Sequence, residues 1–316
     1  MKRFIAIRLL HAIPVVLCVI ALNFLLIHLA PGDPATILAG EGATLAELEL
    51  IREKMGFKEP MHIQFLVYLR QVLTGDLGYS YYALRPVLEI IVERLQYTVY
   101  LLALAFFFSV IIGLVLGVVA SKRPYSRTDG AISFLSLTLY SIPEFWLGMV
   151  FILLFAVNLR IFPTSGIMSV RGSALSPILD MMWHAFLPAS VMTIYWQALY
   201  TRIVRASMLE NLRKDYVITA WAKGCSERTV LFKHALRNAL LPIVTVIGIR
   251  FRVLFTGSVV LETVFAWPGV GRLMYDSIVH LDYPVLMGGF IIVSLVVVLA
   301  NLATDIVYAF LDPRIR

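Results

Sequence analysis

Charged residues are scarce in this chain. Asp, Glu, Lys and Arg make up only 15% of its 316 residues, whereas about a quarter of the residues of a soluble domain are charged. The mean hydropathy is correspondingly high, at +0.85. This composition excludes an ordinary soluble domain and predicts a protein of the lipid bilayer.

The residue patterns that enzymes and metal sites need are also missing. The six histidines are scattered, with no H-E-x-x-H motif and no Cys/His cluster, so no metal site is predicted. Neither a P-loop, G-x-x-x-x-G-K-[ST], nor a G-x-S-x-G nucleophile elbow occurs. We therefore expect a chain that is not an enzyme and does not bind ATP itself. Its two cysteines, Cys18 in an apolar run and Cys225 in a charged loop, are not expected to form a disulfide.

Long apolar runs, in contrast, are plentiful. Crossing about 30 Å of hydrocarbon takes roughly 20 helical residues. Because a spanning backbone must satisfy its own hydrogen bonds, runs of this length are expected to be helices. The predicted fold class is an all-α polytopic membrane protein with six transmembrane helices. The six runs lie at about 9–30, 97–120, 130–157, 186–204, 239–261 and 285–310.

The distribution of Lys and Arg predicts the orientation of these spans. Basic residues gather at the N-terminus, in the loops 121–129 and 202–237, and at the C-terminus, whereas the loops 158–185 and 262–284 hold few. Positive loops face the cytoplasm, so both termini are predicted to be cytoplasmic. The net charge of +7 reflects this bias, and no nucleic-acid partner is expected.

Three regions follow from this topology. Residues 1–30 form a cytoplasmic tip and the first transmembrane helix, residues 31–96 an extracytoplasmic segment, and residues 97–316 a five-helix core with a cytoplasmic loop at 205–238. The extracytoplasmic segment is predicted to be helical. It is either a small cap on the bundle or a surface for docking and for guiding substrate.

This segment contains clear signals for the beginnings and ends of helices. Thr44 and Glu47 form a capping box, Gly56 closes that helix, Pro60 begins the next helix, which stops at Gly75, and Pro86 begins a third.

The cytoplasmic loop contains a basic, patterned insert, "TAWAKGCSERTVLFKHALRNALLPIV" at 219–244. Asp215 is a plausible N-cap for a short helix that ends at Lys223 and the turn residue Gly224. Ser226 caps a second, amphipathic helix, with apolar residues on one stripe and basic residues on the other. The insert is therefore either an interfacial helix on acidic headgroups or a rigid knob that a partner protein grips.

The insert resembles the EAA loop of ABC importer permeases, and in particular the peptide and nickel branch. "TAWAKG" at 219–224 has Trp221 where that branch often has Arg, Ile218 stands where the general pattern begins with Glu, and "HALRNALLP" runs from His234 to Pro242. Further matching signatures follow one another along the chain: "PGDP" (31–34), "GDLGYS" (75–80), "RPV" (85–87), "SIPEFWLG" (141–148), "FPTSG" (162–166), "LETVFAWPGVGRL" (261–273), "DYPV" (282–285) and "DIVYAFLDPRIR" (305–316).

The resemblance implies a type I importer permease fold and the first of two permease subunits of a dipeptide or oligopeptide importer in the bacterial or archaeal cytoplasmic membrane. It implies as partners a second homologous permease, two ATP-binding subunits that hold ATP and Mg, an extracytoplasmic substrate-binding protein and membrane lipid. No cofactor is expected in the chain itself. The same branch also serves nickel, glutathione and opine-like solutes. A self-sufficient secondary transporter or channel is the alternative from another class.

In the family, the helix before the EAA glycine docks on an ATPase subunit and moves with it. The resemblance thus assigns ATPase coupling to matching positions of this chain, namely Tyr216, Thr219, Ala220, Lys223 and Gly224.

Three ionisable residues lie within the predicted spans, and such residues are functional hypotheses by default. Glu144 follows Pro143 in the third span, and Arg250 and Arg252 lie in the fifth. Successive helical residues are 100° apart, so the two arginines cannot both face one pore. One is expected to line the translocation path and the other to pair with Glu144 or with the companion permease. An internal ion pair without a substrate role is an equal alternative.

Overall fold

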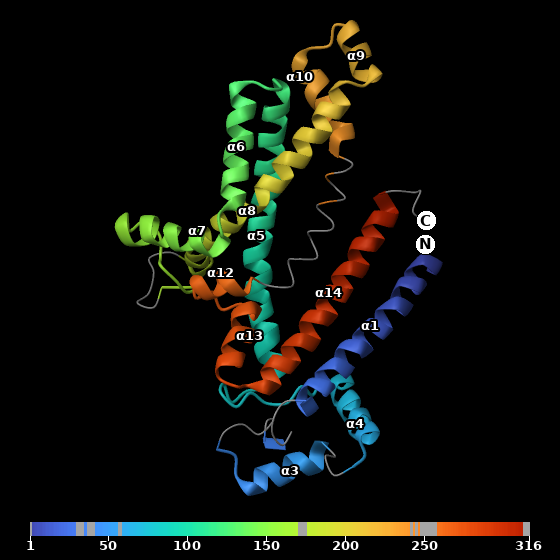
Figure 1. The fold of residues 1–316 in the computed structure, drawn as a ribbon, viewed down its shortest axis with the longest axis vertical. Helices are drawn as coiled ribbons and strands as arrows, with labels where there is room; N and C mark the ends of the chain where they lie inside the picture. The colour runs from blue at the N-terminus through green and yellow to red at the C-terminus, as the bar shows by residue number, and fades with distance from the viewer. Residues whose placement is uncertain are drawn as a thin grey trace. The chain divides into compact units, whose positions relative to one another are not determined.

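The computed structural model describes residues 2–29, 35–36, 42–55, 59–169, 176–240, 243, 246 and 258–311, without the side chains of residues 2–9, 27, 55 and 305–311. Within these ranges the chain is helical, and no β-strand occurs (Figure 1). By contact it divides into two compact units. The terminal unit comprises Met1–Thr98, Phe255–Val259 and Pro268–Arg316, and the central unit comprises Val99–Leu254 and Val260–Trp267.

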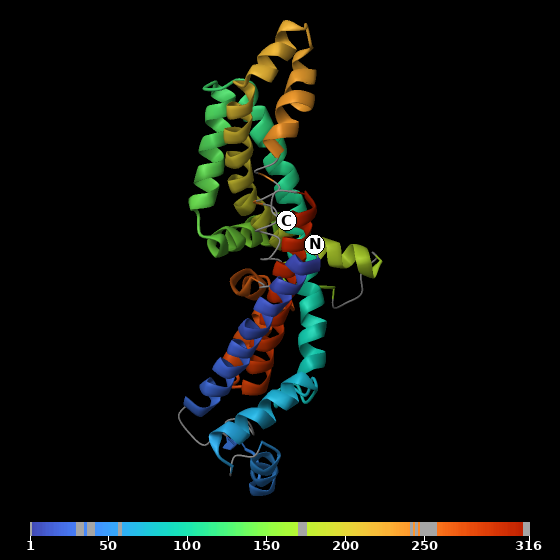
Figure 2. The same ribbon diagram turned by 90° about the vertical axis from the view of Figure 1, so that its right-hand side faces the viewer.

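The terminal unit is built on two long helices, α1 (Lys2–Leu29) and α14 (Tyr283–Leu311), which pack side by side in both views (Figures 1 and 2). The buried Asn23 side chain donates a hydrogen bond to the Met287 carbonyl over 3.4 Å. The short helix α13 (Val270–Val279) also packs on α14. A side chain at Gly288 would collide with Val87, so glycine lets α14 approach the start of α5 (Val87–Lys122).

Two further helices of this unit precede α5 in the chain. These are α3 (Leu45–Met55) and α4 (Met61–Leu73). The capping box is confirmed, because the Thr44 N–H donates to Glu47 Oε2 over 2.7 Å and the Glu47 N–H donates to Thr44 Oγ1 over 3.3 Å. Pro60 is the N-cap of α4, and Gly75, with φ +79°, follows the end of that helix as predicted. Gly56 lies outside the described residues.

The central unit contains α6 (Arg127–Ser141) and α8 (Pro177–Leu212), which lie side by side in both figures. Residues 99–122 of α5 pack closely on α8, because a Cβ at Gly113 or Gly117 would overlap Tyr200 or Val204. The helix α7 (Glu144–Phe151) continues as the π-helix η1 (Ile152–Asn158). Gly148 of α7 leaves room for Leu261 of α12 (Val259–Val264).

Two helices of the described part are long and apolar enough to cross a membrane, namely Val87–Lys122 and Tyr283–Thr304. Arg127–Ser141 and Glu144–Asn158 make a third span if counted as one, although they are bent by 98°. The bend lies at Ile142 and Pro143, neither of which is helical. Ile142 is extended because proline disfavours the α-conformation in the residue before it. The helix Leu10–Leu26 is apolar but shorter.

The predicted count of six spans therefore stays a prediction. The fourth run lies inside α8, which does not meet the same hydropathy test, and most of the fifth run, 239–261, lies outside the described residues. The helix predicted to begin at Pro86 begins there as α5 and continues without a break into the second predicted span. No Pro or Gly separates the two segments, so nothing stops the helix.

Candidate functional site

The patterned insert that follows α8 forms a compact helical knob at the end of that helix (Figure 1). It consists of α9 (Asp215–Ala222), the short helix α10 (Glu227–Thr229) and the π-helix η2 (Val230–Ala235), which is followed by helical residues 236–240. The sequence predicted two helices and a hinge, and this outline is confirmed. The π-helical turns were not predicted.

The corner between α8 and α9 is braced by side chains. The Tyr216 hydroxyl donates to Asn211 Oδ1 over 2.8 Å, and Asn211 Nδ2 donates to the Ser207 carbonyl over 2.8 Å. Asn211 and Ser207 are both buried. Asp215 is the first helical residue and not the predicted N-cap, a position that Lys214 occupies in extended conformation. Its carboxylate still lies at the helix N-terminus, where negative charge is favourable.

The far end of α9 is closed by a tight turn. Gly224 has φ +76°, a conformation that residues with a Cβ rarely adopt. Its N–H donates to the Trp221 carbonyl, and the Cys225 N–H donates to the Ala220 carbonyl over 3.2 Å. Ser226 then caps α10 by accepting from the Thr229 N–H, as predicted. The turn folds η2 back against α9.

A hydrophobic core holds the two arms of the insert together. Val217 and Ala220 of α9 are buried against Val230, Leu231 and Ala235. This core continues to Val204 and Met208 of α8. Because the core is contiguous, the insert and the end of α8 form one packed body.

The exposed face of α9 is apolar and basic. Ile218 and Trp221 are 56% and 48% exposed, and Tyr216, Thr219 and Lys223 are exposed beside them. Ala220, which the resemblance assigned to the coupling set, is only 4% exposed and belongs to the buried core beneath this face. Sequence reasoning did not place Ile218 and Trp221 in that set. Their signal was the spacing of two large apolar residues, three positions apart, on the side of α9 next to Val217 and Ala220.

Two ion pairs tie the insert and α8 to the neighbouring helices. Lys122 at the end of α5 lies 3.3 Å from Glu227 of α10, and both side chains are about half exposed. Arg205 of α8 makes a bidentate pair with the buried Asp129 of α6, at 2.5 and 2.7 Å. Asp129 also accepts from the Tyr125 N–H over 2.8 Å. The second pair was not predicted from the sequence.

The predicted translocation-path residues are only partly described. Glu144 is the first residue of α7, is half-buried and follows the extended Pro143. Arg250 and Arg252 lie outside the described residues, so their pairing with Glu144 stays a prediction. The described part of the chain contains no group of three or more His, Cys, Asp or Glu side chains that could hold a metal ion.

Two family models match the chain. The model described as "Binding-protein-dependent transport system inner membrane component" matches residues 109–316. The corresponding N-terminal model matches residues 1–102. Together they cover nearly the whole chain, including the insert and its supporting helices.

Similar proteins have related descriptions. The oligopeptide transport system permease protein AppB of Bacillus subtilis (strain 168) is 40% identical over 317 residues, the whole length of both chains. A probable peptide ABC transporter permease protein, y4tP, of Sinorhizobium fredii is 41% identical over 98% of this chain and 97% of its own length. The glutathione transport system permease protein GsiC of Salmonella typhi is 38% identical over 100% and 99%.

The fold also has a solved counterpart. A structure of the MetNI methionine ABC transporter in an inward-facing conformation contains a chain that aligns with a TM-score of 0.52 and 19% identity, covering 71% of this chain and 96% of that chain. The likeness shows that the chain has an ABC permease fold. The two family models establish that this chain belongs to the family of inner-membrane components of binding-protein-dependent transport systems.

Proposed function

We propose that this chain is one of two permease subunits of an ATP-driven importer of dipeptides or oligopeptides. In this proposal a second, homologous permease completes the pathway, and two ATP-binding subunits supply the energy. ATP and Mg bind to those subunits, and this chain holds no cofactor. An extracytoplasmic binding protein delivers the substrate. The exposed face of α9, set on a packed and braced insert, is the observation that carries the proposal.

The physical argument concerns transmission of movement. A displacement applied to α9 reaches the membrane only if the insert does not deform. The buried core of the insert and the Tyr216–Asn211 hydrogen bond join α9 to α8, and the Arg205–Asp129 pair joins α8 to α6. An ATPase that binds Ile218 and Trp221 would therefore move α8 and α6 together. The family to which the chain belongs argues against a self-sufficient secondary transporter.

Site-directed cross-linking tests this coupling. In a variant without native cysteines, Ile218→Cys or Trp221→Cys should cross-link to an ATPase subunit, and ATP should change the yield. Ala220→Cys is the matched control, because this neighbouring position is buried and should react poorly. If lipid-phase reagents labelled positions 218 and 221 and the ATPase did not protect them, the insert would be an interfacial helix instead.

Glutathione is a second candidate substrate. The relative from Salmonella typhi named as a glutathione permease is 38% identical over the whole chain, almost as similar as those named for peptides. Glutathione is itself a small peptide, so both substrates call for similar chemistry. Uptake of radiolabelled dipeptides, oligopeptides and glutathione by proteoliposomes containing the whole importer would separate them.

The proposed topology has six spans, cytoplasmic termini and residues 31–96 outside. Cleavage around Arg52 by a protease confined to the cytoplasmic face would contradict it. In the translocation path, one of Arg250 and Arg252 is proposed to face the solute and the other to pair with Glu144 or with the companion permease. Separate Arg→Gln variants should then differ, one assembling but transporting poorly and the other assembling badly.

A further inference from the structure

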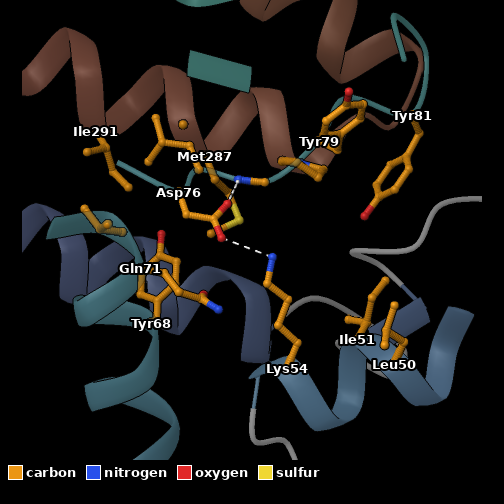
Figure 3. Close-up of a pocket in the computed structure, with 15 residues that line it drawn as sticks. Leu50, Ile51, Lys54, Tyr68, Gln71, Asp76, Tyr79, Tyr81, Met287 and Ile291 are labelled. Atoms are coloured by element: carbon orange, nitrogen blue, oxygen red, sulfur yellow. Dashed lines mark hydrogen bonds and ion pairs between the residues drawn. The ribbon is translucent and has the colours of Figure 1, made fainter. Parts of the chain in front are cut away.

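A cavity of about 260 Å³ lies within the terminal unit. It is bounded by α3, α4, the segment 76–81 and the first turns of α14 (Figure 3). Much of its wall is apolar, with contributions from Leu50, Ile51, Leu77, Met287 and Ile291. The volume is just below the roughly 300–1,000 Å³ of sites for drug-sized ligands. A small ligand with an apolar group would fit.

One cation and one anion meet at this cavity. Lys54 Nζ, reaching from α3, lies 3.1 Å from Asp76 Oδ2, and Asp76 Oδ1 accepts from the Gly78 N–H over 3.2 Å (Figure 3). Burial raises the pKa of Asp76, but the hydrogen bonds from Lys54 and Gly78 and the charge of Lys54 outweigh this, so the pKa lies below its usual range. The Lys54 and Asp76 side chains are 59% and 46% exposed. An ion pair of this kind contributes only about 0–1 kcal/mol and is readily exchanged.

Hydroxyl groups supply further polar contacts. Tyr68 lines the cavity, and its hydroxyl is buried without a hydrogen-bond partner among the described residues. Tyr79 and Tyr81 line the cavity as well, and in Figure 3 they lie on the side away from Tyr68 and Gln71. Burial and the charge of Asp282 raise the pKa of Tyr81 to about 12, so its hydroxyl is a neutral donor. A buried hydroxyl without a partner is unfavourable, and an acceptor on a ligand would remove that penalty.

We propose that this cavity is a binding site for a small zwitterionic peptide with an apolar side chain. The peptide carboxylate would pair with Lys54 and its ammonium group with Asp76, so that two ion pairs replace one. The apolar side chain would enter between Leu50, Ile51 and Ile291, and a peptide carbonyl would accept from Tyr68. The inference rests on the proposed peptide import and adds a binding step on this subunit that is separate from the binding protein.

Binding to the assembled transporter tests the site. The complex, in nanodiscs and without the binding protein, is titrated with radiolabelled alanyl-phenylalanine and with its N-acetylated, C-amidated form. The free peptide should bind at least about tenfold more tightly, because each charge-assisted hydrogen bond is worth roughly that factor. Lys54→Gln and Asp76→Asn should each lose about tenfold in affinity, and Tyr68→Phe should lose severalfold.

The matched controls are Arg70→Gln on α4 and Glu53→Gln on α3, two exposed charges that do not line the cavity. Both should bind the peptide normally, and co-purification with the ATP-binding subunits should show that every variant assembles. Equal binding of free and capped peptide, or normal affinity in the Lys54 and Asp76 variants, would overturn the inference. So would displacement of the peptide by short-chain phosphatidylethanolamine, since the zwitterion would then be a lipid headgroup.

Uptake of the same peptide by the whole importer separates this inference from the proposed function. If proteoliposomes import alanyl-phenylalanine but the transporter without its binding protein does not bind it, the cavity site is refuted and peptide import stands. If a panel of peptides is neither imported nor bound, peptide import itself is refuted.

Discussion

The α9 insert and helix α3 are both short, helical and mainly exposed, but they are held in different ways. The insert has its own buried core, which continues into α8, and the buried Asn211 braces its corner. Helix α3 has no residue with a buried side chain among those described, and its Lys54 reaches Asp76 through a partly exposed ion pair. The first arrangement suits an element that transmits force. The second suits an element that yields to a ligand.

The same distinction between buried and exposed contacts predicts that two kinds of ion pair differ greatly in how much they stabilise the fold. Arg205→Gln should destabilise the central unit by about 2–4 kcal/mol, because it leaves the buried Asp129 uncompensated, with some relief because Arg205 is a quarter exposed. Lys214→Gln removes the exposed pair with Glu210 and should change stability by less than about 1 kcal/mol. Thermal unfolding of the purified permease in detergent measures both. Equal effects would mean that Arg205 and the buried Asp129 do not form the ion pair described.

Helix packing in the central unit gives the next largest effect. A Cβ at Gly117 would overlap Val204, so Gly117→Ala should cost about 1–3 kcal/mol. Gly130, also helical, has open space around it, and Gly130→Ala should instead stabilise by up to about 1 kcal/mol. Both substitutions replace a helical glycine with alanine. If one lowers the stability in the unfolding assay and the other raises it, the difference is due to the packing of Gly117 against α8. If Gly117→Ala raised the stability, α5 and α8 would not approach each other closely at Gly117 and Val204.

Local signals in the sequence predicted the helix ends well. The Thr44–Glu47 capping box, the left-handed Gly224 and the Ser226 cap all depend on contacts within a few residues, and all three are confirmed. Features that depend on distant packing were missed. The Arg205–Asp129 pair joins residues 76 apart, and the burial of Ala220 depends on η2, which follows it.

The bend near Pro143 and the π-helical turns show a second limit. A proline marks a possible break, but hydrophobicity alone predicts one span over 130–157 and says nothing about a bend within it. The π-helical turns of η1 and η2 carry no apolar period that distinguishes them from α-helix. The resemblance to importer permeases, in contrast, was carried by motifs spread along the whole chain, and it is confirmed by the family matches.

The brace at the corner of α8 and α9 should affect coupling more than assembly. Tyr216→Phe removes only a hydroxyl and leaves the buried Asn211 Oδ1 without its donor, at a cost of about 1–3 kcal/mol. We expect the complex to assemble but to import less peptide per ATP hydrolysed. Tyr125→Phe is the control, since it makes the same change at a tyrosine that is 84% exposed and lies outside the insert. An unchanged ratio of peptide uptake to ATP hydrolysis in Tyr216→Phe would show that the Tyr216–Asn211 hydrogen bond is not needed to transmit movement from α9 to α8.

The smallest effect concerns helix α3 and pH. Because the pKa of Asp76 is lower in the folded state, the carboxylate stabilises the fold above its unfolded pKa, near 3.8. That contribution is lost as pH falls through the lower, folded value. The pair is half exposed, so the change should be below about 1 kcal/mol.

Hydrogen exchange of the α3 amides, corrected for intrinsic rates, should therefore accelerate slightly between pH 5 and pH 3 relative to α9. In Asp76→Asn, α3 should exchange slightly faster at pH 5 and show no such acceleration. If wild-type α3 and α9 responded to pH alike, the ion pair would not hold α3, and the two elements would not differ as described.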